Sequence, residues 1–334
     1  MATVMENMPS VTDRPGSSAV IQVENLRHSY GQRAALNGIS FDVRAGEIFA
    51  LLGPNGSGKT TLFRILSTLM LPSGGHALIS GFDAATQPDE VRRRIGVVFQ
   101  AQSVDIKLSA AENLWHQGHL YGLHGSALKQ RIAEMLGRVG LSDRANDRVE
   151  IFSGGMQRRV ELAKGLMHHP SVLLLDEPTT GLDPGARRDL WQYLQELRTQ
   201  ENVSIIVTTH LMEEAERCDR LAILSEGQVV ALGTPLELRS QIGGDVIVVE
   251  TADPASLAAR IQQKFQIAAN VMETSVRMER KDGHRFITDL VEAFPGEVES
   301  ISVSKPTLED VFIGRTGHRF WKDKDAEQNN EVKK

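Results

Sequence analysis

The sequence predicts an α/β fold, with a mostly parallel central sheet flanked by helices and a second, smaller α/β unit after it. Short runs of consecutive apolar residues recur along the first 235 residues and alternate with segments of helical periodicity. This pattern is typical of buried parallel strands joined by helices. A glycine-rich loop stands between one of these runs and a helix. After Gly243-Gly244 the composition changes, and a new set of alternating strands begins.

Length and composition limit what the chain can be. Its 334 residues suffice for one large domain and one small one, and a hydrophobic fraction of 41% supports a packed core. No stretch approaches about 18 consecutive apolar residues, so the chain is not expected to span a membrane by itself. The net charge of −6 argues against a broad nucleic-acid surface. Cys218 is the one cysteine, which excludes an internal disulfide. We therefore expect a cytoplasmic location and no nucleic-acid partner.

The expected strands of the first unit lie in its apolar runs. Residues 21–23 and 39–43 alternate apolar and polar side chains, whereas 47–52 is a short apolar run. Further elements are expected as strands at 95–100, 172–175 and 203–208, as a hairpin at 221–230 with Gly227 at its turn, and as helical structure at 109–140. Together these elements predict one domain over residues 20–240.

Residues outside this domain fall into three segments. Residues 1–19 contain acidic residues and no long apolar stretch, so we expect a flexible leader rather than a secretory signal. Residues 245–315 predict a small accessory α/β domain, with a helix at 255–265 and a strand near 299–303. Residues 320–334 are rich in Lys, Asp, Glu and Asn, which predicts a disordered charged tail.

The glycine-rich loop fits the pattern G-x-x-x-x-G-K-[ST] and lies between the strand at 47–52 and a helix. Its residues are Gly53, Pro54, Asn55, Gly56, Ser57, Gly58, Lys59 and Thr60, with Thr61 directly after them. Glycines let backbone N–H groups surround phosphate oxygens, and the helix adds the positive end of its dipole. Lys59 is expected to reach the β- and γ-phosphates, and the Thr60 hydroxyl to bind Mg²⁺. A chance glycine-rich turn is the alternative, which the strand–loop–helix context disfavours.

Two carboxylates follow the apolar strand at 172–175. Asp176 and Glu177 stand where a buried strand ends, and carboxylates in that position need a cation or water as partner. Ligands of parallel sheets bind at the carboxyl ends of the strands. Asp176 is therefore expected to hold Mg²⁺, directly or through water, and Glu177 to polarise an attacking water. The alternative is a strand that runs into a solvated acidic turn.

A second helix N-terminus is expected at Ser153-Gly154-Gly155, ahead of a helix at 157–168. Its exposed backbone N–H groups and the helix dipole predict a second anion site. The alternative is an N-cap serine followed by two flexible glycines, and spacing alone favours that alternative. Arg158 and Arg159, at the start of this helix, are expected on a solvated face.

Taken together, these motifs resemble those of ABC (ATP-binding cassette) transporter ATPases over roughly residues 20–240. The loop Gly53–Thr60 matches their Walker A motif, and 172–177 matches Walker B with its catalytic glutamate. Residues 152–156 resemble the family signature Leu-Ser-Gly-Gly-Gln, although Phe152 and Met156 stand at its two ends. A Ser-Gly-Gly-Met signature is similar to that of daunorubicin-resistance exporters. The resemblance implies a P-loop NTPase core, with an antiparallel β subdomain and a helical subdomain.

The resemblance also implies roles for residues outside these motifs. Tyr30 matches an aromatic that stacks on adenine, with a core aromatic at a strand end as the alternative. Gln100 matches the Q-loop glutamine, which senses Mg²⁺ and water and links to the membrane partner. Asp183 matches the D-loop, and His210 matches the switch histidine that contacts the γ-phosphate. The expected catalytic residues are thus Glu177, His210 and Gln100. The expected metal ligands are Thr60, Gln100 and Asp176. His168, His169 and Cys218 match no functional position of the family and are expected to be structural.

The mechanism that the resemblance implies is one that a single chain cannot complete. Each ATP, with Mg²⁺, would lie between Walker A of one chain and Ser153-Gly154-Gly155 of a second copy, in a head-to-tail homodimer. A separate transmembrane permease would be the partner that moves the cargo, and the chain would lie on the cytoplasmic face of the cell membrane. The stretch Lys305–Phe312 resembles a segment of exporter ATPases of the drug-resistance and polysaccharide groups.

The expected function is therefore the ATP-hydrolysing motor of an exporter of drug-like or hydrophobic compounds. A lipid-linked saccharide is the alternative cargo. A soluble ABC-type ATPase that acts on ribosomes or DNA is the alternative class of protein. The single Walker A motif, and the lack of a heptad run between Lys59 and Ser153, disfavour that class.

Overall fold

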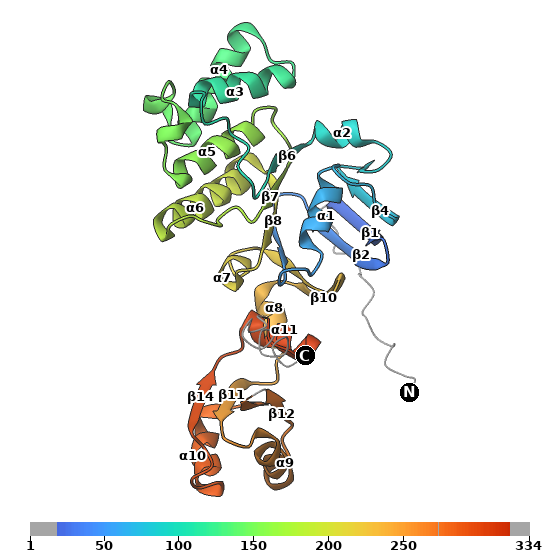
Figure 1. The fold of residues 1–334 in the computed structure, drawn as a ribbon, viewed down its shortest axis with the longest axis vertical. Helices are drawn as coiled ribbons and strands as arrows, with labels where there is room; N and C mark the ends of the chain where they lie inside the picture. Colours follow the sequence, from blue (N-terminus) through green and yellow to red (C-terminus); the bar gives the residue numbers. More distant parts are fainter. Residues whose placement is uncertain (1–18, 273, 321–334) are drawn as a thin grey trace, which may run out of the picture.

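The computed structural model describes residues 19–272 and 274–320, which form an elongated molecule with three parts (Figure 1). A helical part lies at one end, a part with two sheets lies in the middle, and a small α/β unit lies at the other end. The leader expected at 1–19 and the tail expected at 320–334 fall outside the described residues, except for Ala19 and Phe320.

The middle part is built on a six-stranded sheet with the order β10-β9-β3-β8-β7-β6. Its strands are β3 (Ile48–Leu52), β6 (Ile95–Val98), β7 (Val172–Asp176), β8 (Ser204–Thr209), β9 (Arg220–Ser225) and β10 (Gln228–Gly233). Neighbouring strands from β9 to β6 run parallel, and β10 pairs antiparallel with β9. The predicted parallel sheet and the hairpin at 221–230 are therefore confirmed.

A second, antiparallel sheet lies beside the first and has the order β2-β1-β4-β5. Its strands are β1 (Ala19–Tyr30), β2 (Arg33–Arg44), β4 (Gly74–Ile79) and β5 (Phe82–Asp83), and helix α2 (Pro88–Arg92) follows them. Helix α1 (Lys59–Leu66) packs against both sheets, because its apolar side chains share one core with them.

The helical part and its neighbours follow the predicted periodicity, with a difference at the start of one helix. The helices are α3 (Ala110–Leu120), α4 (Gly125–Arg138), α5 (Gly154–Gly165), α6 (Pro184–Glu201) and α7 (Met212–Ala215), with single 3₁₀ turns at Ser142–Arg144 and Val149–Ile151. The helical structure expected at 109–140 is confirmed as two helices, α3 and α4, because the chain turns at Gly122, which has a φ of 78°. The helix expected at 157–168 begins at Gly154, because the Ser153 hydroxyl caps it there.

Both faces of the parallel sheet are covered, which explains its apolar strands. Every residue of β3, β7 and β8 is buried. Successive side chains of a strand point to opposite faces. Ile48, Ala50 and Leu52 accordingly pack with helices α3 to α6, whereas Phe49 and Leu51 pack with α1 and the antiparallel sheet.

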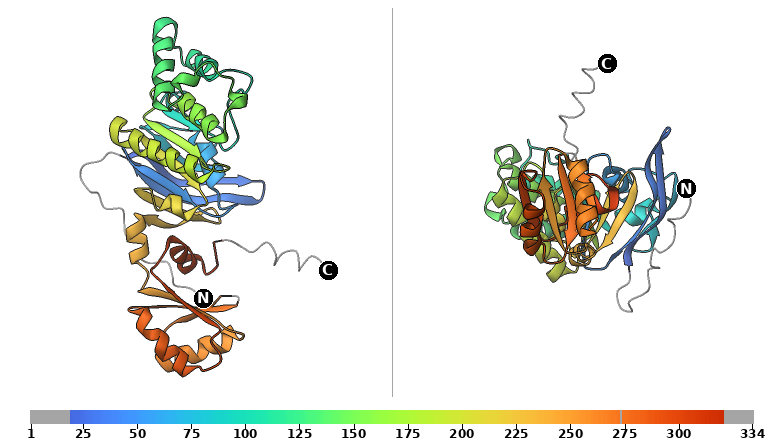
Figure 2. Two further views of the ribbon diagram at one scale, coloured as in Figure 1. Left: turned by 90° about the vertical axis from the view of Figure 1, so that its left-hand side faces the viewer. Right: turned by 90° about the horizontal axis from the view of Figure 1, so that it is seen from below.

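The C-terminal unit is a four-stranded antiparallel sheet with two helices on one face (Figure 2). Its elements are β11 (Asp245–Glu250), α9 (Pro254–Phe265), β12 (Ala269–Met272), β13 (Ser275–Arg280), α10 (Gly283–Ala293) and β14 (Ser300–Ser304), and the strand order is β12-β13-β11-β14. The unit has an apolar core of its own, which includes Ile247 and Phe286. The helix expected at 255–265 and the strand expected near 299–303 are confirmed.

After this unit the chain returns to the middle part. Helix α8 (Pro235–Ser240) leads into the unit, and helix α11 (Leu308–Thr316) leaves it and packs against α8 and β10. Leu308 and Phe312 of α11 are buried in the same apolar core as helices α3 to α6. Phe320, which was expected in a disordered tail, is 2% exposed and lies against Phe312, with ring centroids 4.9 Å apart. The domain limits at 20–240 and 245–315 stay a prediction. Helix α11, although it lies within 245–316 in sequence, packs against the first domain.

No helix within 19–272 and 274–320 combines the length and the apolar character that a bilayer span requires.

Candidate functional site

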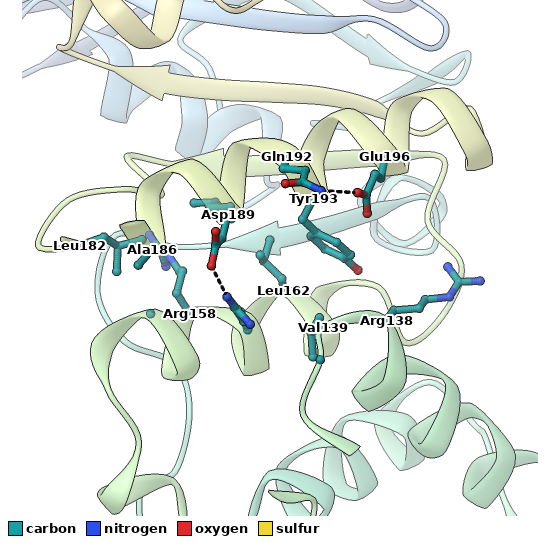
Figure 3. A pocket seen from close by; sticks show the side chains of 14 residues that line it. Arg138, Val139, Arg158, Leu162, Leu182, Ala186, Asp189, Gln192, Tyr193 and Glu196 are labelled. Carbon is teal, nitrogen blue, oxygen red and sulfur yellow. Dashed lines mark hydrogen bonds and ion pairs between the residues drawn. The ribbon is translucent and has the colours of Figure 1, made fainter. Parts of the chain in front are cut away.

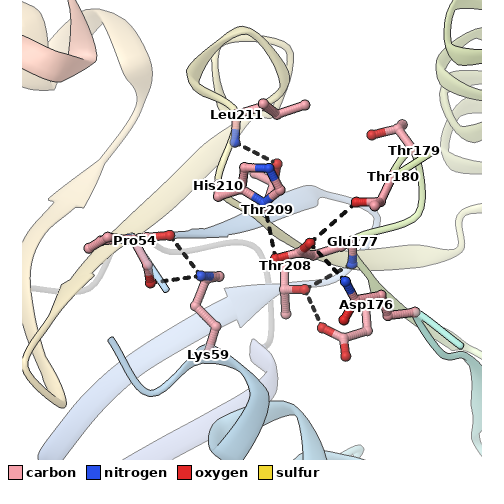
Figure 4. A network of polar contacts seen from close by, with 12 residues as sticks. Pro54, Lys59, Asp176, Glu177, Thr179, Thr180, Thr208, Thr209, His210 and Leu211 are labelled. Carbon is pink, nitrogen blue, oxygen red and sulfur yellow. Dashed lines mark hydrogen bonds and ion pairs between the residues drawn. The ribbon is translucent and has the colours of Figure 1, made fainter. Parts of the chain in front are cut away.

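The expected site residues gather at one edge of the parallel sheet. Strands β3, β8, β7 and β6 are neighbours and run parallel, so their carboxyl ends meet at this edge. The glycine-rich loop follows β3, His210 follows β8, Asp176 and Glu177 stand at the end of β7, and Gln100 follows β6. Figure 4 shows the loop, the two acids and His210 converging from these strands.

A cavity of about 590 Å³ opens at this edge. The expected residues that line it are Tyr30, Asn55, Gly56, Gly58, Lys59, Thr60, Thr61, Gln100, Glu177 and His210. Four residues that sequence reasoning missed also line it: Arg33, Ala34, Ala35 and Thr180. The first three begin strand β2, which pairs with the end of β1 at Tyr30, and their closeness to Tyr30 in sequence is the signal that could have found them.

The glycine-rich loop is held in shape by its own lysine. Lys59 is 5% exposed, and its Nζ donates to the carbonyl oxygens of Gly53 at 2.7 Å and Pro54 at 3.0 Å. Burial lowers the pKa of Lys59, whereas the negative charges of Glu177 and Asp176 oppose that shift. The ammonium group therefore lies fixed at the wall of the cavity, where it can bind an anion through charge-assisted hydrogen bonds.

Gly58 shows why this loop needs glycine before its helix. Its φ is 105°, and a Cβ atom there would lie 2.7 Å from the carbonyl oxygen of Ala35 and 2.9 Å from Cδ2 of Leu36. Helix α1 begins at the next residue, so the N–H groups of residues 59–61 have no intrahelical acceptor. Those three residues line the cavity, and together with the helix dipole they form an anion-binding wall.

Asp176 lies below the cavity and receives one short hydrogen bond. It is 7% exposed, and its Oδ1 accepts from the Thr208 hydroxyl at 2.5 Å (Figure 4). Burial raises the pKa of Asp176, and the Thr208 hydrogen bond acts in the opposite direction. Sequence reasoning missed Thr208, because a threonine inside a β-branched strand gives no sign of a functional contact.

Glu177 is surrounded by three polar groups. Its Oε1 lies 3.1 Å from Nδ1 of His210, and its Oε2 accepts from the Gln100 amide at 3.3 Å and from the Thr180 hydroxyl at 3.2 Å. Its backbone φ of 44° lies in the left-handed region, which is uncommon for glutamate. The Glu177 N–H donates to both oxygens of Thr208, at 3.0 and 3.1 Å, and so holds this conformation. The structure thus brings the three expected catalytic residues into contact.

Tyr30 lies at the rim of the cavity. It is 47% exposed, and its hydroxyl lies 3.5 Å from the Thr61 hydroxyl and 3.4 Å from the Met70 sulfur. The alternative interpretation, a core aromatic at a strand end, is wrong because the ring reaches solvent. An accessible aromatic ring beside an anion-binding loop can stack on a planar ligand group.

The second glycine motif lies apart from this cavity. Ser153 caps α5 by accepting from the N–H of Met156 at 3.3 Å, and Asp183 caps α6 in the same way. Neither Ser153-Gly154-Gly155 nor Asp183 lines the cavity that Lys59 lines. Gly155 instead lines a second cavity, of about 230 Å³, between α5 and α6 (Figure 3). One chain therefore does not bring the two glycine motifs together at one cavity.

The prediction of a solvated face is wrong for Arg158. Its side chain is 8% exposed and forms an ion pair with Glu161 at 2.7 Å. This side of α5 packs against the segments that follow β6 and β7, a contact that the helical pattern alone did not reveal. Arg159 lies on the outer side, 37% exposed, with an ion pair to Asp189 at 2.7 Å.

Three protein families match parts of the sequence. The ABC transporter family matches residues 36–180. The family described as "ATP-binding protein DrrA1-3-like, C-terminal domain" matches residues 233–316. A shorter match, over 154–216, is to an AAA domain family.

Relatives are similar along almost the whole chain. The linearmycin resistance ATP-binding protein of Bacillus subtilis is 36% identical over 89% of this chain and 98% of its own length. A daunorubicin resistance ATP-binding protein of Streptomyces coeruleorubidus is 37% identical, over 90% of this chain and 95% of its own length. The chain belongs to the ATP-binding subunits of ABC transporters. Another relative of this ABC ATPase is the Nod factor export ATP-binding protein I of Burkholderia orbicola, which is 42% identical over 91% of this chain and 99% of its own length.

Solved cassettes share the fold of this ABC ATPase. The protein cbiO1 of Clostridium perfringens, part of the ABC transporter complex cbiONQ, is 27% identical with a TM-score of 0.62 and covers 74% of this chain and 96% of its own. The ATP-binding cassette MJ0796, solved as a dimer in a post-hydrolysis state with ADP and Pi, is 28% identical with a TM-score of 0.58 and covers 64% of this chain and 98% of its own. The predicted cassette fold is confirmed, and the chain is an enzyme that binds nucleotide and hydrolyses ATP.

Proposed function

We propose that this ABC ATPase is the motor subunit of a membrane exporter, and that the cavity at the carboxyl edge of the parallel sheet is its ATP site. One observation carries the assignment of the site. Lys59 and Glu177 line the same cavity, so a cation for the phosphates faces the same space as a carboxylate for water.

The glycine-rich loop would hold the triphosphate. Lys59 and the backbone N–H groups of Gly56 and of residues 58–61, all of which line the cavity, are donors suited to phosphate oxygens. Tyr30, at the rim, would stack on the adenine ring, since half of its surface is open to solvent. Arg33, which lines the cavity beside Tyr30, adds a second positive charge for the phosphates.

Mg²⁺ would be held by Thr60, Gln100 and Asp176. Magnesium prefers oxygen ligands and retains part of its water shell, so a hydroxyl, an amide oxygen and one carboxylate form a fitting set. Asp176 supports this fit, because a buried carboxylate whose donor among the described residues is the Thr208 hydroxyl is stabilised further by a nearby cation. The bound ion would neutralise charge on the phosphates.

Hydrolysis would depend on Glu177. Its carboxylate would orient the attacking water and accept its proton, while the Gln100 amide and the Thr180 hydroxyl hold the carboxylate in place. His210, 3.1 Å from the same carboxylate, would contact the γ-phosphate. Catalysis would consist mainly of positioning and charge stabilisation, as in other phosphoryl transfers.

A second copy of the chain would complete each site. Ser153-Gly154-Gly155 begins a helix, is exposed at Ser153 and lies outside the cavity of its own chain, so it is available to a nucleotide held by a partner. A head-to-tail pair with two-fold symmetry would use the same surface twice and form two equal sites. Asp183 would lie at this interface. The pair would work with a separate transmembrane permease and lie on the cytoplasmic face of the membrane.

We propose a hydrophobic, drug-like compound as the cargo. Two relatives of nearly full length are named for resistance to linearmycin and to daunorubicin. A second candidate is a lipid-linked saccharide, since the relative named for Nod factor export is 42% identical. The same names favour a transport role over a soluble ATPase that acts on ribosomes or DNA.

The test of the site is Glu177→Gln in the full chain. We expect nucleotide affinity to stay within a few-fold of wild type while the turnover of ATP falls by about 10²-fold or more. We also expect the variant to form a dimer in the presence of ATP and Mg²⁺, measured by light scattering after size exclusion. Glu213→Gln, an exposed position on α7, is the matched control and should hydrolyse ATP normally. Near-normal turnover in Glu177→Gln would reject the role of this residue.

The exporter assignment has its own test. Affinity purification of the tagged chain from solubilised membranes should recover an integral membrane protein with several apolar segments of about 20 residues. Recovery of ribosomes or DNA in its place would support the soluble alternative.

A further inference from the structure

One side of helix α5 is polar where it lies against the chain that follows β6. The residues of this side are Gln157, Arg158, Glu161 and Lys164. Their spacing places them along one face of the helix. The face contacts residues 99–103, the segment that contains Gln100. Buried helix faces are normally apolar, so this polar one needs a reason.

Arg158 makes the most contacts on this face. Its Nη1 pairs with Oε2 of Glu161 at 2.7 Å, and both side chains are almost fully buried. The same guanidinium donates to the carbonyl oxygen of Phe99 at 2.7 Å, to that of Pro178 at 2.8 Å and to that of Glu177 at 3.4 Å. One side chain therefore joins the segment after β6 to the segment after β7.

The same helix holds the other end of the segment after β6. Glu161 Oε1 accepts from the Ser103 N–H at 2.6 Å, and Lys164 Nζ donates to the Ser103 carbonyl at 2.5 Å. The backbone is thus bound at Phe99 and again at Ser103, and Gln100 lies between these two points. A segment fixed at both ends leaves little freedom to the residue inside it.

Stability alone does not favour this arrangement. Moving two charges out of water carries a large desolvation penalty, and apolar side chains of similar volume often replace a buried ion pair without loss of stability. An apolar pair, however, cannot donate to three carbonyl oxygens in fixed directions. The planar guanidinium can, and lysine offers only a point charge on a flexible stem. The contacts of Arg158 therefore specify geometry.

We propose that Arg158, supported by Glu161, is a positioning residue that sets the relation between Gln100 and Glu177. It binds the backbone on both sides of the 3.3 Å contact between the Gln100 amide and the Glu177 carboxylate. The proposal rests on the role proposed above for Glu177. It adds a residue that acts on hydrolysis through the backbone and does not line the ATP cavity.

The main test is the double variant Arg158→Met/Glu161→Leu in the full chain. It removes both charges together, so the fold should persist with a melting temperature close to that of wild type. The affinity for ATP should stay within about twofold, since the glycine-rich loop keeps its contacts. Turnover at saturating ATP should fall by about 10²-fold, the effect expected when a catalytic group is displaced by about 1 Å.

A graded variant and a matched control accompany it. Arg158→Lys keeps the charge opposite Glu161 but loses the fork that reaches several carbonyls, so its turnover should lie between those of wild type and the double variant. Arg159→Met makes the same kind of change one residue along, at a half-exposed ion pair, and its turnover should stay within about twofold of wild type.

The outcomes separate this inference from the function on which it rests. Wild-type turnover in a folded double variant overturns the positioning role, even if Glu177→Gln is slow. Normal turnover in Glu177→Gln overturns the proposed role of Glu177 itself. If the double variant does not fold, Arg158→Lys decides, and wild-type turnover in that variant also overturns the positioning role.

Discussion

Thr208 provides the sharpest test of how the site is built. It is fully buried in β8, and its hydroxyl donates to Asp176 Oδ1 at 2.5 Å while accepting from the Glu177 N–H at 3.0 Å. Thr208→Val keeps the branched shape of the side chain and removes the hydroxyl. The Glu177 N–H keeps a second acceptor, the Thr208 carbonyl at 3.1 Å. The group that loses most is therefore the buried carboxylate of Asp176.

The expected magnitude follows from that carboxylate. A hydrogen bond to a charged group contributes about 1.5–3 kcal/mol, so we expect Thr208→Val to lower the free energy of unfolding by about 2 kcal/mol at neutral pH. Burial already raises the pKa of Asp176, and loss of the Thr208 hydrogen bond should raise it further. The difference from wild type should shrink as the pH falls, because a protonated Asp176 depends less on that donor.

The assay is urea unfolding followed by fluorescence, in which the buried Trp191 reports on the cassette core. ATP turnover is measured on the same samples and should fall, because Asp176 loses its hydrogen-bond donor and the Glu177 N–H loses one of its two acceptors. Thr199→Val is the matched control, since the Thr199 hydroxyl donates to the backbone carbonyls of Gln195 and Glu196 within its own exposed helix turn. Its effect should be within about 0.5 kcal/mol. Equal unfolding curves for wild type and Thr208→Val would refute the reasoning.

Three further predictions concern the glycine-rich loop and the half-buried His168. Lys59→Ala should weaken ATP binding at least about tenfold in a titration with a fluorescent analogue, and unchanged affinity would reject the phosphate-binding role. Gly58→Ala should destabilise the chain by about 2–3 kcal/mol, whereas Gly31→Ala, with no atom within 4 Å of its Cβ position, should lose only about 1 kcal/mol in thermal unfolding. Burial lowers the pKa of His168 to about 4 in the folded chain, whereas an unfolded histidine has a pKa of about 6.5. Between these two values the unfolded chain binds a proton that the folded chain does not. The free energy of unfolding should therefore decrease as the pH falls from about 6.5 toward 4. His168→Phe keeps a ring for stacking on Tyr121 and should flatten this slope, and an unchanged slope would contradict the assignment.

The candidate site residues that the sequence predicted all follow strands that can be recognised from their apolar runs. Asp176, Glu177 and His210 each come after an apolar run, and neighbouring parallel strands place their carboxyl ends at one edge. Local patterns were therefore enough to predict that these side chains, far apart in sequence, lie close together in the structure. The glycine-rich loop was predictable for a related reason, since Gly58 has a backbone conformation that other residues rarely adopt.

Other features had no local signal. Arg158 and Arg159 are adjacent and identical in the sequence, yet one is buried in an ion pair and the other lies half-exposed. Their difference depends on which side of α5 meets the segment after β6, and that is a property of packing between distant parts. The same holds for Thr208, whose importance comes from the neighbouring strand β7.

By itself, the sequence determined the parallel α/β core, the glycine-rich loop between a strand and a helix, and the acids at the strand ends, because strand burial and glycine conformation constrain the residues nearby. The resemblance of its motifs to a known family indicated the cassette fold. Only the tertiary structure decided that α11 returns to the core of the first domain, that Ser153-Gly154-Gly155 lies outside the cavity of its own chain, and that Arg158 is buried. These features depend on contacts between segments far apart in the chain. Such a contact depends on the shape and chemistry of both segments, so the sequence of one segment does not specify which other segment it packs against.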